Sequence, residues 1–342
     1  MKIATQSISQ LAMALVLLVY LIGIPVLFAD RSYVLTVLIT ASMLAFMALG
    51  VWLTFSIGRI NIAQSGFGLI GAYAGAILVE HGVSFWLCLP LAGLAAGITG
   101  MAIGYPILRL KGVYFAMLTI SLAEAIRLIA LNGGGVTRGA SGYVGLPLPD
   151  AIELFGVTII PAFEPGARLP FYYLAAIILI AGILITWRIH SSRLGAVFRS
   201  LQQNEELASS LGIDIAGYRV LAFSICCAFG GIGGAFFMAL QQNVYPTSFQ
   251  VSDSVYLMMY CFIGGLSHPL GAVVGTFALV IGFELLGEFE RYQSILFAAV
   301  MIGAMVALPN GLVSLASPTS WFPRARFKAT VADTSEKKAQ AT

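Results

Sequence analysis

Apolar residues occur along most of the chain in long, almost unbroken runs, separated by short polar or Gly-rich segments. Many runs reach about 18 residues, the length that an α-helix needs to cross the hydrocarbon core of a bilayer. A strand of a membrane barrel instead shows about ten residues of alternating polarity. Because backbone polar groups inside lipid must be paired, the runs predict helices, and we expect an all-α polytopic membrane protein.

The hydrophobic pattern predicts about ten transmembrane helices. The first run could be mistaken for a signal peptide, but its length and the lack of an Ala-x-Ala cleavage pattern favour a retained helix. The third predicted span is the least regular, because its first turn is polar and Gly-rich. The predicted spans are Gln10–Ala29, Tyr33–Ile57, Asn61–Val79, Phe85–Leu108, Val113–Leu131, Leu169–Ile189, Gly217–Gln241, Ser252–Leu266, Leu270–Leu286 and Ser294–Leu308.

The distribution of charge predicts the orientation of these spans. Only 10% of the residues are charged and the net charge is +3, which gives no indication of nucleic-acid binding. With both termini in the cytoplasm, the basic residues gather on the inner side, as the positive-inside rule requires. The expected inner residues are Lys2, Arg59, Arg109, Lys111, Arg188, Arg193, Arg199, Arg219, Arg324, Arg326, Lys328, Lys337 and Lys338, and the outer ones are Arg31, Arg138, Arg168 and Arg291.

Two segments of the sequence lie outside the predicted membrane helices in ways that a simple connector does not explain. The outer loop 132–168 is long enough to hold short structure of its own, either as a lid or spacer or as a surface for a partner. Residues 324–342 form a basic, then polar tail that we expect to be disordered and cytoplasmic. The transmembrane domain is therefore expected to cover residues 1–323.

Small residues recur four positions apart, as at Gly71 and Gly75 or at Gly271 and Gly275. This spacing predicts close approach of helix backbones. The denser cluster of glycines at 230–234 has two interpretations, a packing surface or a flexible point in a moving helix.

Ionisable and polar residues within the spans are candidates for a transport pathway, since they are costly in lipid. Glu124 and Arg127 are three residues apart, so they share a helix face and can form an ion pair. That pair is either structural or part of a pathway. Gln64 and Ser65 could bind a polar solute or hydrogen-bond a neighbouring helix.

No motif of a nucleotide hydrolase, an esterase or a metallopeptidase occurs in the sequence. We therefore predict that the protein is not an enzyme and has no cofactor, so that any energy for transport comes from a partner or an ion gradient. The four cysteines and three histidines show no metal-ligand spacing, and no metal site is predicted. They are Cys88, Cys226, Cys227 and Cys261, and His81, His190 and His268.

The segment Phe198–Ile213, FRSLQQNEELASSLGI, is a polar interruption on the predicted cytoplasmic side. It reads as one short amphipathic helix with a modest apolar face, and a helix this short is marginal unless something covers it. Asn204, Glu205 and Glu206 offer polar contacts, and Gly212 suits a helix stop. The apolar face would contain Leu201, Leu207, Ala208 and Leu211.

This segment resembles the cytoplasmic coupling loop of permease subunits of ABC importers, specifically the LivM-type branched-chain amino acid permease family. It agrees with that loop at Arg199, Asn204, Glu205, Ala208, Leu211, Gly212 and Ile213. The block GRINIAQSGFGLIGAY is similar at Gly58, Gln64, Phe67, Gly71, Ala72 and Tyr73, and LRLKGVYFAMLTISLAEAIRL is similar nearly throughout. Further similarity follows in order up to about residue 315. His268 and Pro269 depart from the family's usual Gly and Ser.

The resemblance implies ABC importer permease architecture in the bacterial inner membrane. The implied partners are a homologous second permease, two cytoplasmic ATPases that dock on Phe198–Ile213, and a periplasmic solute-binding protein. Branched-chain amino acids are the expected substrate, with urea, amides or aromatic acids as alternatives within the family and an ion-coupled secondary transporter as the rival class. Candidate pathway residues are Gln64, Ser65, Tyr73 and Glu124.

Overall fold

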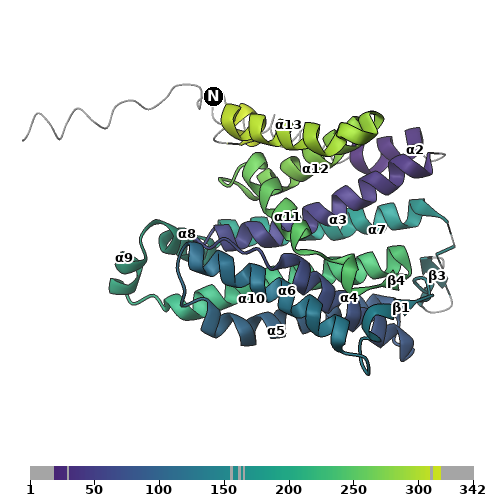
Figure 1. Cartoon of the computed structure of the whole chain (residues 1–342), viewed down its shortest axis with the longest axis horizontal. Helices are drawn as coiled ribbons and strands as arrows, with labels where there is room; N and C mark the ends of the chain where they lie inside the picture. The colour runs from purple at the N-terminus through teal and green to yellow at the C-terminus, as the bar shows by residue number, and fades with distance from the viewer. Residues whose placement is uncertain are drawn as a thin grey trace, which may run out of the picture.

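Figure 1 shows the computed structural model of the chain, an elongated bundle of helices. The structure describes residues 19–28, 31–154, 157–160, 163–164, 166–308 and 311–316. Its architecture confirms the all-α polytopic class, because helices far outweigh four short strands. The helices are α2 (Ile24–Phe28), α3 (Ser32–Phe55), α4 (Gln64–Glu80), α5 (Phe85–Ile107), α6 (Val113–Asn132), α7 (Arg168–Ser191), α8 (Arg193–Gln203), α9 (Glu205–Ser210), α10 (Ile215–Gln241), α11 (Val251–Gly264), α12 (Pro269–Leu285) and α13 (Gln293–Ala307). The strands are β1 (Tyr143–Val144), β2 (Ile152–Leu154), β3 (Val157–Ile160) and β4 (Asn243–Val244).

Within the described residues, five helices are long and apolar enough to cross a membrane: α3, α5, α6, α7 and α10. α11 and α12 add at most one more span, because the chain bends by 112° between them. α4 has 17 residues and α13 has 15, and a 15-residue helix is only about 22 Å long. The predicted count of ten is therefore not confirmed. Most of the predicted first span and the whole tail 324–342 lie outside the described residues.

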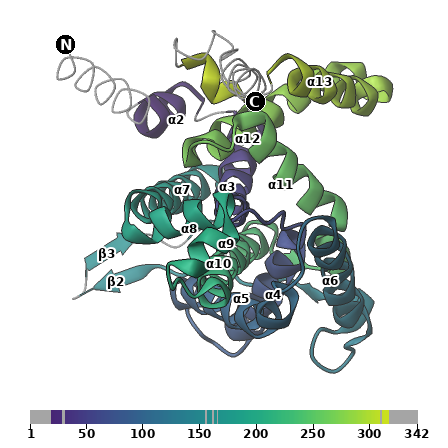
Figure 2. The ribbon, with the colours of Figure 1, turned by 90° about the vertical axis from the view of Figure 1, so that its left-hand side faces the viewer.

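The central helix of the bundle is α10, which packs against α3, α4 and α5 (Figure 2). Its inward face is lined by large side chains such as Phe223 and Phe236, which are fully buried. Phe229 stacks on Phe46 of α3 with their ring centroids 4.6 Å apart. α6 is the least buried of the five membrane-length helices and lies at the edge of this group.

Glycines bring α4 and α10 into backbone contact. A Cβ atom added at Gly234 would fall on the carbonyl group of Gly68, and one at Gly71 would fall on the backbone of Gly231. Such contacts let dispersion forces and weak hydrogen bonds act between helices that gain little from the hydrophobic effect in lipid. The glycine cluster at 230–234 is thus a packing surface in this structure.

A second glycine contact folds α12 back against α11. Gly264 meets the backbone of Gly271, and Gly275 meets that of Tyr260. In the turn between them, His268 caps α12 by accepting a hydrogen bond at Nδ1 from the backbone N–H of Leu270, at 3.2 Å. Pro269 follows at the first helical position, where its missing N–H costs nothing. His268 and Pro269 therefore start α12 as its N-cap and first helical residue.

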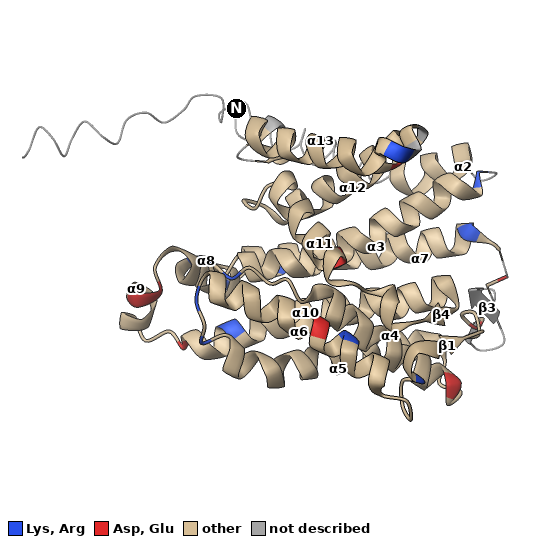
Figure 3. Ribbon diagram, in the orientation of Figure 1, with Lys and Arg blue, Asp and Glu red and all other residues tan. Residues whose placement is uncertain are grey.

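The two ends of the bundle carry different structures. α8 and α9 lie at one end, and the short strands lie at the other (Figure 1). β1 pairs antiparallel with β4, and β2 pairs with β3, so the predicted outer loop contains structure of its own. Figure 3 shows that charged residues are concentrated towards these ends, with few partway along the helices.

Candidate functional site

The segment Phe198–Ile213 contains the end of α8 and the whole of α9, so the prediction of one amphipathic helix is wrong. α8 ends at Gln203, and Asn204 adopts an extended conformation with φ −155° before α9 begins. The Asn204 side-chain oxygen accepts a hydrogen bond from the backbone N–H of Leu207 at 3.0 Å, which makes Asn204 the N-cap of α9. Gly212 has φ +79° and follows the end of α9, as expected for a helix stop.

The break at Asn204 also divides the predicted apolar face. Leu201 and Ala208 are buried against the bundle, whereas Leu207 is 59% exposed and Leu211 is 73% exposed. The predicted face fails because α8 and α9 do not share one helical register. The exposed part of α9 therefore presents two leucines beside polar residues.

Glu205 lies at the base of α9 and is surrounded by three basic residues of the same chain. Arg219 of α10 donates to both carboxylate oxygens, at 2.9 and 2.7 Å. Nζ of Lys111 lies 3.3 Å from Oε2, and NH2 of Arg59 lies 3.8 Å from it. Hydrogen bonding to Arg219 is the main reason why the pKa of Glu205 falls from 4.5 to about 2, although partial burial opposes this shift. Glu205 thus links α9 to the start of α10 through Arg219 and to the loops that contain Arg59 and Lys111.

The three cations outnumber the single carboxylate. Arg59 is 6% exposed and Arg219 is 5% exposed. Burial and the charge of Arg219 lower the pKa of Arg59, while Glu205 raises it. The Nε atoms of both arginines have no hydrogen-bond partner among the described residues. The cluster therefore depends on the charge of Glu205. The sequence did not predict that Arg59, Lys111 and Arg219 are ion-pair partners of Glu205. The positive-inside rule had placed all three on the same side of the membrane as Phe198–Ile213.

Arg199 of α8 contacts the end of α7. Its NH1 atom donates to the carbonyl oxygen of His190 at 2.9 Å. A cation at this position also interacts favourably with the last carbonyl groups of a helix. Arg199 therefore anchors α8 to α7 and is half-buried.

Gln64 and Ser65 make hydrogen bonds between helices. Nε2 of Gln64 donates to the carbonyl oxygens of Met47 and Cys226, at 3.2 and 3.1 Å, and its Oε1 accepts from the Cys226 thiol at 3.0 Å. The Ser65 hydroxyl accepts from Ser254 at 2.6 Å. Gln64 and Ser65 are both buried, so their contacts favour the neighbouring-helix interpretation over direct solute binding.

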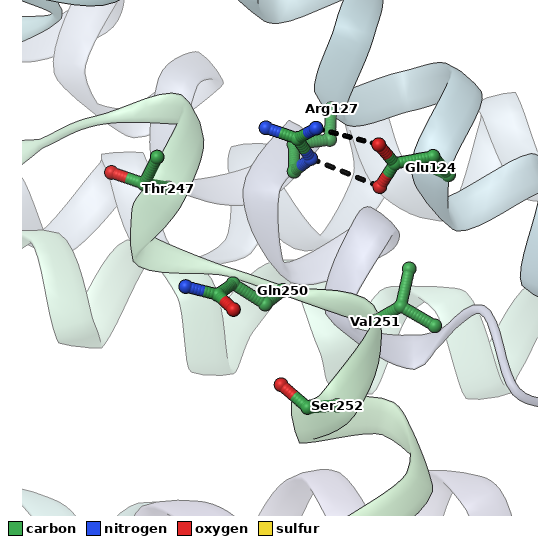
Figure 4. A pocket seen from close by; sticks show the side chains of 6 residues that line it. All are labelled: Glu124, Arg127, Thr247, Gln250, Val251 and Ser252. Atoms are coloured by element: carbon green, nitrogen blue, oxygen red, sulfur yellow. Dashed lines mark hydrogen bonds and ion pairs between the residues drawn. The ribbon is translucent and has the colours of Figure 1, made fainter.

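Glu124 and Arg127 line a pocket between α6 and the segment that leads into α11, and Figure 4 shows their side chains facing each other. Arg127 donates from Nε and NH2 to the two carboxylate oxygens of Glu124, at 2.9 and 2.5 Å. The pocket has a volume of about 420 Å³. Its other lining residues are Thr247, Gln250, Val251 and Ser252. Sequence reasoning found the ion pair but missed these four, because nothing in their local pattern marks a site.

No group of three or more His, Cys, Asp or Glu side chains suited to a metal ion occurs among the described residues. The four cysteines are buried and unbridged. The described part of the chain therefore offers two candidate sites, a polar pocket beside α6 and an exposed segment at α9.

Comparison with known proteins assigns the family. Residues 33–305 match the family described as branched-chain amino acid transport system / permease component. The chain belongs to this family. The permease is 30% identical over 302 residues to the high-affinity branched-chain amino acid transport system permease protein LivM of Salmonella typhimurium, an alignment that covers 82% of this chain and 70% of that protein.

Two further relatives show the breadth of the family. Over 305 residues the permease is 30% identical to LivM of Escherichia coli K12, covering 83% of this chain and 71% of LivM. It is 23% identical over 279 residues to the ribose import permease protein RbsC of the same organism, covering 78% of this chain and 82% of RbsC. No solved structure gives a significant match. These relatives are named as transport permeases, and the permease is a multi-pass membrane protein.

Replacing Tyr73 by phenylalanine is expected to leave the stability of the permease unchanged or to raise it slightly. Tyr73 is 5% exposed, and its hydroxyl has no hydrogen-bond partner within the described part of the chain. Removing an unsatisfied buried hydroxyl relieves a desolvation penalty of about 1–3 kcal/mol. Thermal unfolding of the purified protein measures the change. A clear loss of stability would show that the hydroxyl has a partner, and unchanged stability with reduced uptake would assign Tyr73 to the pathway.

Proposed function

We propose that this permease is the membrane subunit of an ABC importer for branched-chain amino acids in the bacterial inner membrane, with both termini in the cytoplasm. The match of residues 33–305 to the family, together with 30% identity to two LivM proteins, carries this proposal. The partners are a homologous permease, two cytoplasmic ATPases and a periplasmic solute-binding protein. The short strands at the end opposite α9 provide the surface nearest to a periplasmic partner.

The ATPases dock on the coupling segment Phe198–Ile213. Support comes from the exposure of Leu207 and Leu211 on α9 and from the way in which Glu205 joins α9 to the rest of the bundle. When the ATPases close, they push α9. The ion cluster transmits that movement to α10 through Arg219 and to the neighbouring loops through Arg59 and Lys111. Helices on either side of the segment then rock between two packings and open the pathway alternately to each side.

Import of urea, amides or aromatic acids keeps the same architecture and changes only the cargo. An ion-coupled secondary transporter would need a carboxylate within the membrane that can bind a proton or cation. Glu124 is the membrane carboxylate in the pocket, but Arg127 occupies both of its oxygens. The match to the permease family favours the ABC importer over ion coupling.

The test is uptake of radiolabelled leucine and urea by cells that express the complete complex, with active ATPases and with ATPases inactivated by mutation. We expect leucine to enter only with active ATPases. ATP-dependent uptake of urea alone would keep the importer and replace its substrate. Uptake that continues with inactive ATPases would contradict the proposal and support ion coupling.

A further inference from the structure

The Glu124–Arg127 pair is placed where charge is expensive. Both residues lie on α6, which has the length and composition of a membrane span and is the least buried helix of that group. Their side chains are 40% and 22% exposed. Charged side chains at such positions face a bundle interior or a water-filled cavity rather than lipid. The pocket that they line is therefore part of a polar path or of an interface that encloses one.

The pocket combines charge of both signs with hydrogen-bonding groups and one apolar wall. The carboxylate of Glu124 and the guanidinium of Arg127 lie side by side (Figure 4). Thr247, Gln250 and Ser252 add polar groups from the opposite wall, and Val251 adds an apolar surface. A volume of about 420 Å³ is within the range of about 300–1,000 Å³ that is usual for small-molecule sites.

We propose that this pocket is a transit site for the charged end of a zwitterionic amino acid. Arg127 binds the substrate carboxylate in the bidentate geometry that it now uses for Glu124, and Glu124 binds the substrate ammonium group. One ion pair of the protein is thus replaced by two ion pairs with the substrate, and the net charge of the pocket stays zero. This inference rests on the proposed import of amino acids.

The same arrangement distinguishes among the alternative substrates. Urea carries no charge. If it separated Glu124 from Arg127, neither residue would gain a new counter-ion. An aromatic acid without an amino group satisfies Arg127 but leaves the carboxylate of Glu124 unpaired, which is costly at this depth. Only a molecule with both charges satisfies Glu124 and Arg127 together.

The test compares three variants within the complete transporter: Glu124→Gln, Arg127→Gln and the double variant that carries both changes. We expect each single variant to lose at least about tenfold in the kcat/KM of ATP-dependent leucine uptake, because one charge-assisted contact is lost. The double variant is expected to remain as poor as the singles, with a normal amount of protein in the membrane. The control on the same helix is Ser121→Ala, which removes an exposed hydroxyl that donates to the carbonyl oxygen of Met117, and uptake should be unchanged.

A purely structural ion pair predicts a different result. Neutralising one partner would then leave an unpaired charge, whereas neutralising both would restore uptake to nearly the wild-type rate. That restoration, with wild-type leucine uptake intact, would overturn the transit site and leave the proposed function standing. No leucine uptake by the wild-type complex would overturn the proposed function and, with it, this inference.

Discussion

Replacing Gly234 by alanine is expected to prevent α10 from packing normally against α4 and to lower the stability of the permease by about 3 kcal/mol or more. The added methyl group would overlap the carbonyl group of Gly68, which belongs to the backbone and has no rotamer to adopt. Either the helices separate, or α10 bends at the centre of the bundle. The yield of monodisperse purified protein and its thermal unfolding temperature measure the effect.

Alanine substitutions at two other glycines are controls in which the added methyl group meets a weaker obstacle or none. At Gly75, a Cβ atom would meet the terminal methyl group of Met238 at 2.8 Å, which a flexible side chain can relieve. At Gly303 of α13 it would meet no atom of the described residues within 4 Å, so Gly303→Ala should be neutral or stabilise the helix by up to about 1 kcal/mol. Equal stability of the Gly234 and Gly303 variants would contradict backbone contact between α4 and α10.

The sequence predicted the long helices well because their signal is local. The predicted span Tyr33–Ile57 corresponds to α3, Ser32–Phe55, and the span Gly217–Gln241 corresponds to α10, Ile215–Gln241. A continuous apolar run of membrane length leaves the chain no other way to pair its backbone polar groups. The Glu124–Arg127 pair was predictable for the same reason, since its spacing on a helix determines the contact.

The remaining features depend on contacts between residues far apart in the chain. The bend between α11 and α12 requires Gly264 and Gly271 to meet, and hydropathy alone reads this region as two ordinary spans. The break at Asn204 arises because a capping side chain competes with the helix, although the flanking residues favour helix on both sides. The wall of the pocket formed by Thr247, Gln250 and Ser252 comes from a segment more than a hundred residues beyond α6.

Replacing Glu205 by glutamine is expected to destabilise the permease by about 3 kcal/mol at neutral pH and to release α9 from the bundle. The change leaves Arg59, Lys111 and Arg219 in one cluster with no carboxylate of the same chain among their described ion-pair partners. The pKa of Glu205 is lowered in the folded protein, from 4.5 to about 2. Its contribution is therefore fully present above pH 4.5 and is lost as the pH falls towards 2. Thermal unfolding at neutral pH measures the loss.

Glu206→Gln is the matched control, since Glu206 is the next residue of α9, is exposed and has no ion pair among the described residues. It should leave the stability of the permease unchanged. If the proposed docking is correct, Glu205→Gln also weakens co-purification with the ATPases, because a released α9 no longer presents Leu207 and Leu211 in one orientation. Normal stability of the Glu205 variant would show that the three cations find other counter-charges. If co-purification is lost while stability is normal, Glu205 is a direct docking contact. If both co-purification and stability are reduced, Glu205 is the residue that positions the docking surface.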